Sequence, residues 1–467
     1  MSSLPLAAER IDLQSFGSNQ SVSLSEILSA LSFALDLTEG AVPGHAQRSC
    51  VLGMRLGKEL GMPPHQMAIL YYALLLKDVG CSSNAARLCQ IIGGGDERRV
   101  KAGVKLEDWT RPNRPKLSTL ELLWNTVLPD AGVVRRTAGI LKIGLTQHRN
   151  NEEMITLRCD RGAHILRKLG LGSDAAEAVR GLDEHWDGSG YPERRIGNTI
   201  PLESRILAVA QHLDAFASER GTGEAMKVLR ERSGRWFDPD VVRTAEVLHC
   251  DGSLWRAALR DTPEDETRNA TLQLGPDTID TLKAADIDLI CEAFADVVDA
   301  KSTFTYRHSL GVTAAAVSIA LALGLNEERT RLVNRAALLH DIGKLRVPNS
   351  ILDKPGKLDA EEWRVVQEHP RLTREILSRI GPFGELAMIA GAHHEKLDGT
   401  GYPDRLTAAQ LPLEARIIAV ADVYGALTED RPYRPGMALE QVVEIMSRDI
   451  PHKLDADCFE ALISAVS

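Results

Sequence analysis

The 467-residue sequence has no apolar run of bilayer length, because charged residues interrupt every apolar stretch. Residues 1–16 contain acids and no long apolar core, which argues against a secretory signal. The seven cysteines form no Cys-x-x-Cys pair, so we expect reduced thiols that are mostly buried. Together these absences predict a cytoplasmic protein without a membrane span.

The sequence also lacks an excess of positive charge. Its 65 acidic residues outnumber its 55 basic residues, and the formal net charge is −10. Duplex-DNA binders neutralise phosphates with cationic side chains, so this balance argues against that class. The negative net charge does not exclude binding of a small anionic ligand in a locally positive site. We interpret the six tryptophans as packing groups rather than as a platform for stacked bases.

Apolar residues recur mainly with helical spacing, for example over residues 24–37 and 281–298. A chain of this length is too long for one hydrophobic core. We therefore predict an all-α protein with two tandem helical domains. The predicted domains are residues 1–260 and 275–467, and the polar segment 261–274 is the predicted linker.

Two short strings in the second half concentrate metal-binding residue types. They are HDIGK at residues 340–344 and HHEKLDGTGYP at residues 393–403. Adjacent His-Asp and His-His pairs are costly to bury unless a divalent cation binds their nitrogen and oxygen lone pairs. The strings therefore predict a metal site, and with it a hydrolase.

We expect residues 335–344 to form one helix, on which neighbouring side chains diverge by about 100°. His340 would then bind one metal, while the two oxygens of Asp341 could bridge two. Lys344 would follow His340 by one turn on the same face, where it could hold a phosphate oxygen. The alternative for Lys344 is an ordinary lysine near the last carbonyls of a helix.

Three further residues extend these strings to a candidate ligand set rich in histidine and oxygen donors. The seven members are His308, His340, Asp341, His369, His393, His394 and Asp422.

Further motifs accompany the two strings, in a fixed order. They are KPGKL at 354–358, His369-Pro370, and VADVYGALTEDRPYR at 420–434. With these motifs the second half resembles the HD-GYP family, a branch of the HD phosphohydrolase superfamily. Characterised members of that family hydrolyse the bacterial second messenger cyclic di-GMP. The resemblance implies HD-type domains and a cyclic di-GMP phosphodiesterase whose product is pGpG or GMP.

The resemblance also implies two divalent metal ions and their ligands. One metal would be held by His308, His340, Asp341 and Asp422, and the other by Asp341, His369, His393 and His394. Iron or manganese suits such donors, with zinc, cobalt and nickel left open. Asp341 and Lys344 are the implied catalytic residues. Substrate would be bound by Lys344 together with Arg431, Tyr433 and Arg434, whose guanidinium groups suit a phosphodiester or a guanine edge.

The sequence departs from the family pattern at three positions. Phe304 stands where some members have a carboxylate that adds a third metal, so we expect two metals. Gly425 and Ser302 stand where the family commonly has Asp. We expect catalysis to survive there with weaker support of the metal ligands.

The first half repeats the second with most of these residues replaced. DGSGYP at 187–192 matches DGTGYP at 398–403 with an offset of 211, whereas His45 and Asp78 match His308 and Asp341 with an offset of 263. The difference, 263 − 211 = 52 residues, predicts an insertion near residues 81–145. Most of the candidate ligands have lost their counterparts. Lys77 replaces His340 and Arg158 replaces His369, while Leu182-Asp183 replaces His393-His394 and Gln211 replaces Asp422. We therefore predict a degenerate domain that is regulatory or structural.

The replacements suggest that Lys77 and Arg158 act electrostatically in place of missing metals, near Asp78 and Asp183. The alternative is drift in a structural domain. The basic run within residues 96–116 of the insertion is best interpreted as a solvated loop, with contact to a phosphate or a partner as the second reading.

Three functions fit these observations. The first is an active cyclic di-GMP phosphodiesterase. The second is a phosphohydrolase of another cyclic dinucleotide or nucleotide, and the third is a nucleotide-sensing adaptor with little or no turnover. A signalling-protein partner and a homodimer are further expectations.

Overall fold

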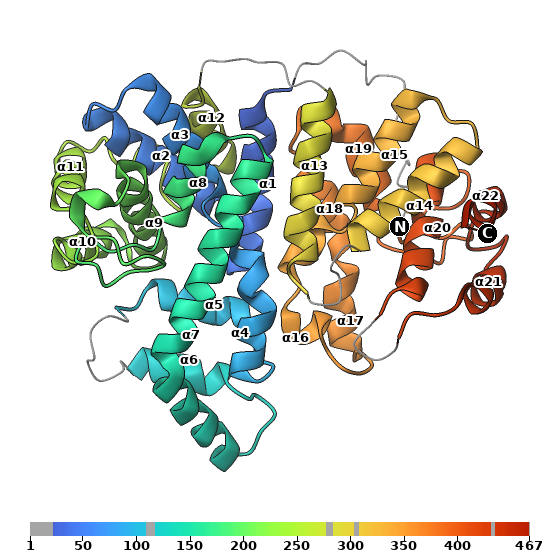
Figure 1. The fold of residues 1–467 in the computed structure, drawn as a ribbon, viewed down its shortest axis with the longest axis horizontal. Helices are drawn as coiled ribbons and strands as arrows, with labels where there is room; N and C mark the ends of the chain where they lie inside the picture. Colours follow the sequence, from blue (N-terminus) through green and yellow to red (C-terminus); the bar gives the residue numbers. More distant parts are fainter. Residues whose placement is uncertain (1–21, 109–116, 277–283, 303–307, 431–434, 467) are drawn as a thin grey trace, which may run out of the picture.

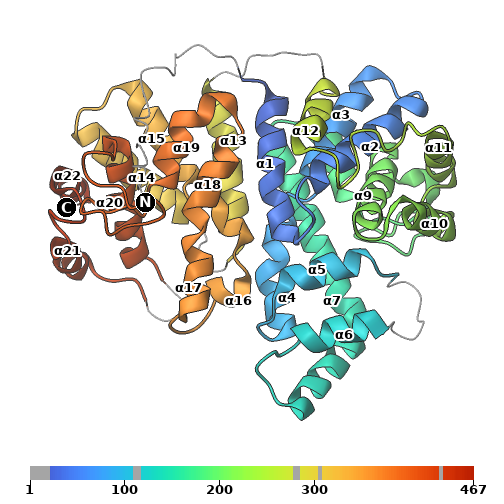
Figure 2. The same cartoon turned by 180° about the vertical axis from the view of Figure 1, so that it is seen from behind.

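The computed structural model describes residues 22–108, 117–276, 284–302, 308–430 and 435–466. Within these ranges every regular element is a helix and no strand forms, apart from isolated bridges. The prediction of an all-α fold is confirmed. Two groups of helices lie side by side, and α1 (Leu24–Glu39) faces α13 (Ala284–Asp299) at their boundary (Figures 1 and 2). No described helix is long and apolar enough to cross a membrane.

The first group is built from α1 and the helices that follow it. These are α2 (His45–Glu59), α3 (Pro64–Leu76), η2 (Cys81–Asn84), α8 (Gly172–Arg180), η3 (Gly197–Thr199), α9 (Leu202–Arg220), α10 (Thr222–Arg232) and α11 (Pro239–Cys250). The long helix α7 (Val133–Lys168) packs its C-terminal part on α8.

The second group begins with α13. It continues with α14 (His308–Ala322), α15 (Glu327–Leu339), η4 (Ile342–Arg346), α16 (Asn349–Leu352), α17 (Ala360–Gln367), α18 (His369–Leu377), η5 (Gly381–Phe383), α19 (Gly384–Gly391), α20 (Leu413–Thr428), α21 (Leu439–Ser447) and α22 (Ala456–Val466). Local signals start several of these helices. Asn326 caps α15 by accepting from the Arg329 backbone N–H at 2.9 Å, and Asp359 forms a capping box with Glu362 at the start of α17.

Helix α1 connects the two groups. Most of its residues are buried, and it contacts α2 and α3 on one side and η4 and α18 on the other. One apolar core therefore runs through both halves of the protein. The division of the chain at residues 260–275 stays a prediction.

The segment 261–274, which we expected as a linker, contains helix α12 (Glu264–Gln273). This helix packs on α1 and α2, and it buries Thr267 and Thr271 one turn apart on the same face. The hydroxyl of Thr271 donates to the Thr267 carbonyl at 2.8 Å. Most of the polar segment is thus packed on the first half rather than extended between domains.

The insertion forms a projection from the first half (Figure 1). It consists of α4 (Ala85–Ile92), α5 (Glu97–Lys105), α6 (Leu117–Thr126) and the N-terminal part of α7. It has a small apolar core of its own, made of Leu88, Ile92, Val100 and Val127.

The expectation of a solvated basic loop is wrong for residues 97–105. Glu97, Lys101 and Lys105 recur every four residues, so they share one face of α5. Lys101 and Lys105 form ion pairs with the buried Glu39 at 3.2 and 2.9 Å. Lys101 and Lys105 are therefore directed inward, where they compensate a buried carboxylate of the first half, whereas Arg99 of the same run is exposed.

Glu97, at the start of α5, reaches the second half. Its fully buried carboxylate accepts from the Asn349 backbone N–H at 3.1 and 3.2 Å and lies 3.5 Å from the Lys301 ammonium. The Asn349 side chain in turn donates to the Lys301 carbonyl at 2.6 Å. One carboxylate of the insertion thus joins the end of α13 to the start of α16.

Two equivalent glycines show that the halves share a close backbone approach. A Cβ on Gly343 would overlap the His369 carbonyl oxygen, and a Cβ on Gly80 would overlap the Arg158 carbonyl oxygen. These pairs correspond through the offsets of 263 and 211. In the second half only glycine lets the turn after His340 pack against α18. In the first half only glycine lets the turn after Lys77 pack against α7.

We expect Gly343→Ala and Gly80→Ala each to lower the free energy of unfolding by about 3 kcal/mol, because overpacking against a backbone atom has no flexible neighbour to absorb it. Thermal and denaturant unfolding would measure the loss. Gly144→Ala is the matched control, since Gly144 is exposed within α7 with open space around its Cβ position. Alanine there should raise stability by about 0.5–1 kcal/mol. A Gly343→Ala protein that unfolds like wild type would contradict the close approach.

Candidate metal centre

The seven candidate ligands converge in the second half, mostly at helix ends. His308 and His369 begin α14 and α18, His340 and Asp341 follow α15, His393 and His394 follow α19, and Asp422 lies within α20. All but His394 are buried. Residues from five parts of the chain thus form one cluster.

The expected single helix over residues 335–344 is wrong. Helix α15 ends at Leu339, His340 caps it, and η4 begins after Asp341. The helix ends just before Gly343, which packs against the start of α18. The side chain of Lys344 therefore does not lie one helical turn after His340 on the same face. It forms an ion pair with Asp341, with its Nζ 2.6 Å from Asp341 Oδ2.

The carboxylate of Asp341 lies between two pairs of imidazoles. Its Oδ2 is 3.3 Å from His340 Nε2 and 3.7 Å from His308 Nε2. Its Oδ1 is 3.3 Å from His369 Nε2 and 3.8 Å from His393 Nε2. Each oxygen faces a different pair, which is the arrangement a bridging ligand needs.

Asp422 is the second carboxylate of the cluster. Its Oδ1 is 3.4 Å from His308 Nε2 and 3.8 Å from His340 Nε2, and its Oδ2 is 3.6 Å from His394 Nδ1. Among the described residues of the second half, three groups have potential ligand atoms within 4.8 Å of one another, and His340, Asp341 and His393 form the group that overlaps the other two. One of these two is His308, His340 and Asp422, and the other is His369, His393 and His394.

Backbone carbonyls orient three of the imidazoles. The Nδ1 atoms of His340, His369 and His393 lie 2.6–2.7 Å from the carbonyl oxygens of Ala337, Val366 and Ala390, each three residues earlier. A carbonyl only accepts, so Nδ1 carries the proton and Nε2 presents its lone pair to the cluster. This is the usual preparation of a histidine ligand.

The residues fit divalent cations. The Nε2 atoms of His369 and His393 lie 3.1 Å apart, so two lone pairs face each other unless a cation lies between them. His308 Nε2, His340 Nε2 and Asp341 Oδ1 are buried without a hydrogen-bond partner among the described residues. Such atoms are costly unless something binds them.

The protonation states of three imidazoles and of Asp341 agree with this fit. Burial lowers the pKa of His369 and His393, and it lowers the pKa of His394 to about 3, so these imidazoles are neutral at pH 7. Burial alone would raise the pKa of Asp341, but His340 and Lys344 outweigh it and hold that pKa well below its usual value. Neutral imidazoles and ionised carboxylates are the forms that bind metals.

The protonation states of His308 and His340 differ. Burial disfavours their charged forms, but Asp422 and Glu429 raise the pKa of His308 to about 9 and Asp341 raises that of His340. A metal would therefore displace a proton from each of these two imidazoles.

Comparison with known proteins identifies the family. A model of the HD domain family matches residues 139–241 and 292–458, more than half of the chain. The sequence is 40% identical over 454 residues to 3′3′-cGAMP-specific phosphodiesterase 3 of Vibrio cholerae, covering 95% of both chains. This chain belongs to the HD-GYP family.

Other relatives agree. A segment of 149 residues is 44% identical to the cyclic di-GMP phosphodiesterase response regulator RpfG of Xanthomonas campestris, covering 31% of this chain and 39% of that protein. The crystal structure of a cyclic GMP-AMP-specific phosphodiesterase of Vibrio cholerae, V-cGAP3, superposes with a TM-score of 0.65 at 36% identity. That match covers 96% of this chain and 98% of the solved one. HD-domain phosphohydrolases depend on divalent metals, in agreement with the cluster.

The loop that gives the HD-GYP family its name is fixed by Glu395, which the sequence reasoning missed as a functional residue. The buried carboxylate of Glu395 accepts from the backbone N–H groups of Asp404, Arg405 and Leu406 at 2.7, 3.1 and 2.9 Å. The loop places the Tyr402 ring 4.8 Å from the His394 ring, so Tyr402 packs beside a candidate ligand. The sequence did contain a signal for this role: the repeat has a glutamate, Glu184, at the position equivalent to Glu395 through the offset of 211.

The first half is a degenerate HD-GYP copy in which cations surround the remaining acids. Lys77, opposite His340, forms an ion pair with Asp78, and Lys105 lies 3.5 Å from the same carboxylate. Arg158, opposite His369, pairs with Asp183. Lys101 and Lys105 come from the insertion, and sequence spacing alone did not connect them with this site.

Glu39, Asp78 and Cys81 are close enough to share a metal ion. However, Lys105 contacts both carboxylates, and burial raises the pKa of the Cys81 thiol, so sulfur stays protonated. Protein cations thus stand where this half would otherwise hold a metal.

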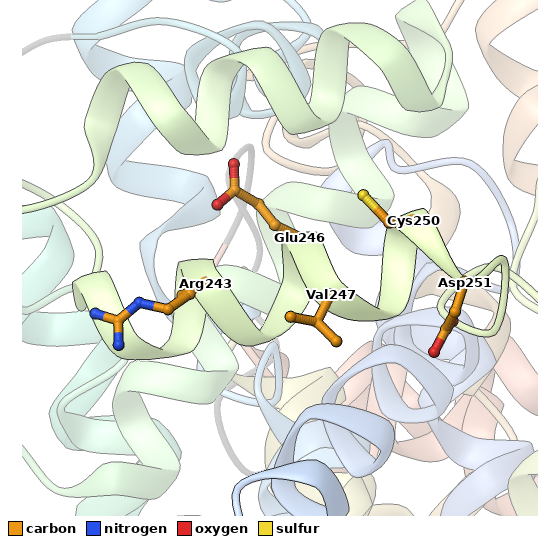
Figure 3. A pocket seen from close by; sticks show the side chains of 5 residues that line it. All are labelled: Arg243, Glu246, Val247, Cys250 and Asp251. Atoms are coloured by element: carbon orange, nitrogen blue, oxygen red, sulfur yellow. The ribbon is translucent and has the colours of Figure 1, made fainter.

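Four residues named from the family resemblance lie outside the described residues. They are Phe304, Arg431, Tyr433 and Arg434. Their roles stay predictions. One surface hollow is lined by Arg243, Glu246, Val247, Cys250 and Asp251, on and just after α11 (Figure 3). It contains none of the candidate ligands.

We expect Asp341→Asn to reduce metal content from about two ions per chain to a small fraction, because one bridging carboxylate serves both positions. Metal analysis of the purified protein would measure it. Asp78→Asn, at the equivalent position of the first half, is the matched control and should keep the wild-type content. Equal loss in both variants would contradict the placement of the metals in the second half.

We expect Lys77→Met to destabilise the first half by about 3–5 kcal/mol, since it leaves the buried Asp78 carboxylate short of a cation. Thermal unfolding would measure the change. Lys142→Met is the control, because Lys142 is exposed on α7. Unchanged unfolding of Lys77→Met would refute the view that cations replace metals in this half.

Proposed function

We propose that the chain is a metal-dependent phosphodiesterase that opens a 3′3′-linked cyclic dinucleotide to its linear form. The Asp341 carboxylate carries this proposal, because its two oxygens face two separate sets of imidazoles. Divalent cations held by these residues would lower the pKa of water and neutralise charge on a phosphodiester. The proposed ligands are the seven residues of the sequence prediction, with Asp341 shared.

Lys344 would supply a positive charge for the substrate. Its ammonium group contacts Asp341, and its side chain is 18% exposed. Once Asp341 is engaged by metal, Lys344 is placed to donate to a non-bridging phosphate oxygen. A fixed cation that pairs with developing negative charge stabilises the transition state without moving.

Exposure indicates the side from which substrate approaches. The side chains of His308, His340, His369 and His393 are at most 1% exposed, whereas those of His394 and Lys344 are 24% and 18% exposed. The deep imidazoles orient the site and exclude water behind it. Substrate would therefore meet the edge formed by His394 and Lys344, and Arg431, Tyr433 and Arg434 are proposed to contact it there.

We propose 3′3′-cGAMP as the preferred substrate and cyclic di-GMP as the second candidate. The relative that matches both halves and the insertion is specific for 3′3′-cGAMP. The cyclic di-GMP phosphodiesterases of Xanthomonas campestris and Thermotoga maritima match only 31% and 29% of this chain. Cyclic di-GMP is thus supported by relatives that match less than a third of the chain, and it would yield pGpG or GMP.

We expect the metal-loaded protein to hydrolyse 3′3′-cGAMP with a higher kcat/KM than cyclic di-GMP. Lys344→Met should lower kcat by about 10²–10³, the usual effect of removing one electrostatic contact to a transition state. Liquid chromatography of the products would measure both substrates, with Lys142→Met as the control. Faster turnover of cyclic di-GMP would favour the second candidate, and full metal occupancy without turnover would favour the nucleotide-sensing adaptor.

A further inference from the structure

His308 differs from the other imidazoles of the centre in the group that orients it. Its Nδ1 lies 2.7 Å from Oε2 of Glu429, whereas His340, His369 and His393 use backbone carbonyls. Glu429 follows the last residue of α20, and its side chain is 27% exposed. Glu429 lies within the 420–434 motif, but the sequence analysis assigned it no role.

The first half also orients its first histidine with a carboxylate, but from a position one turn earlier on the equivalent helix. Nδ1 of His45 lies 2.6 Å from Oδ2 of Asp214, and both side chains are buried. His45 corresponds to His308 through the offset of 263, and α9, which carries Asp214, corresponds to α20. The equivalent of Asp214 through the offset of 211 is Gly425, which has no side chain to make the contact.

Glu429 lies four residues after Gly425, one turn along the same face. A Cβ built on Gly425 would lie 3.6 Å from His308 Cε1 and 3.7 Å from Glu429 Oε1. The longer glutamate side chain thus reaches back into the space beside a helical glycine. Glycine within a helix costs about 1 kcal/mol relative to alanine, so its presence beside this contact needs a reason.

We propose that Glu429 is a positioning residue of the metal centre, which supplies from one turn further along α20 the carboxylate that the first half supplies from Asp214. By accepting the Nδ1 proton of His308, it leaves Nε2 available to a cation held between that atom and the oxygens of Asp341 and Asp422, which lie 3.7 and 3.4 Å from it. The carboxylate also makes the imidazole a stronger donor to a cation. Gly425 therefore marks a relocated contact and not the weaker support that the sequence suggested.

The inference rests on the proposed metal centre, so its test reads metal binding and not turnover. The probe is Mn²⁺, titrated into metal-free full-length protein by calorimetry. In Glu429→Ala one of the two Mn²⁺ binding events should weaken by about 10–100-fold, the range known for contacts that orient ligands. Glu429→Gln keeps a hydrogen-bond acceptor without the charge, and it should fall between Glu429→Ala and wild type.

The decisive variant moves the carboxylate back by one turn. Gly425→Asp combined with Glu429→Ala restores the arrangement of His45 and Asp214, with Val312 giving way slightly, since its Cγ2 lies 3.0 Å from the new Cβ. We expect it to recover most of the Mn²⁺ affinity that Glu429→Ala loses. A merely structural glutamate would not be rescued from position 425.

Glu444→Ala is the control, because Glu444 is exposed on α21 and pairs only with Arg448 among the contacts described for it. It should bind Mn²⁺ like wild type. Wild-type affinity in Glu429→Ala would overturn the proposal, as would a double variant that folds but binds no better than Glu429→Ala. If Glu429→Ala does not fold, wild-type Mn²⁺ affinity in Glu429→Gln overturns the proposal equally. Absence of cyclic dinucleotide hydrolysis would count against the proposed function alone, since Mn²⁺ binding is measured without substrate.

Discussion

The structure of the second half depends on a buried carboxylate, Asp341, that needs positive charge on both of its oxygens. Desolvation opposes its ionised form, but the charges of His340 and Lys344 outweigh that cost and hold its pKa well below the usual value. The C-terminal ends of α15 and α19 and the starts of α14 and α18 all meet around it, and four of the five histidines are oriented by backbone carbonyls or by Glu429. A cluster so arranged is stable when cations occupy it, because the same lone pairs that repel one another become ligands.

The two halves meet the same requirement with different chemistry. Asp78, the counterpart of Asp341, is surrounded by Lys77 and Lys105, which are fixed charges of the protein itself. The surrounding framework is kept: a glycine packs against the next helix, a glutamate holds the GYP loop, and a carboxylate orients the first histidine. Loss of metal binding therefore changed the centre of the first half while its supports persisted, which fits a domain retained for packing or regulation.

The insertion connects these two centres. One face of α5 presents Lys101 and Lys105 to the acids of the first half and Glu97 to Lys301 and Asn349 of the second. Lys301 precedes His308 by seven residues, and Asn349 follows Lys344 by five. With α1 packed against α2 and α3 on one side and η4 and α18 on the other, the first half is packed directly against the elements that carry the candidate ligands.

The sequence by itself determined the helical fold, the repeat, the insertion and the seven candidate ligands, because motif spacing and apolar periodicity are local properties. Only the tertiary structure decided the break of α15 after Leu339, the pairing of Lys344 with Asp341, and which imidazole nitrogen faces the cluster. It also revealed Glu429 beside His308, 121 residues away, and Lys105 beside Asp78. Such contacts depend on how helices pack and on how buried charges are compensated, and neither is encoded in the spacing of residues along one element.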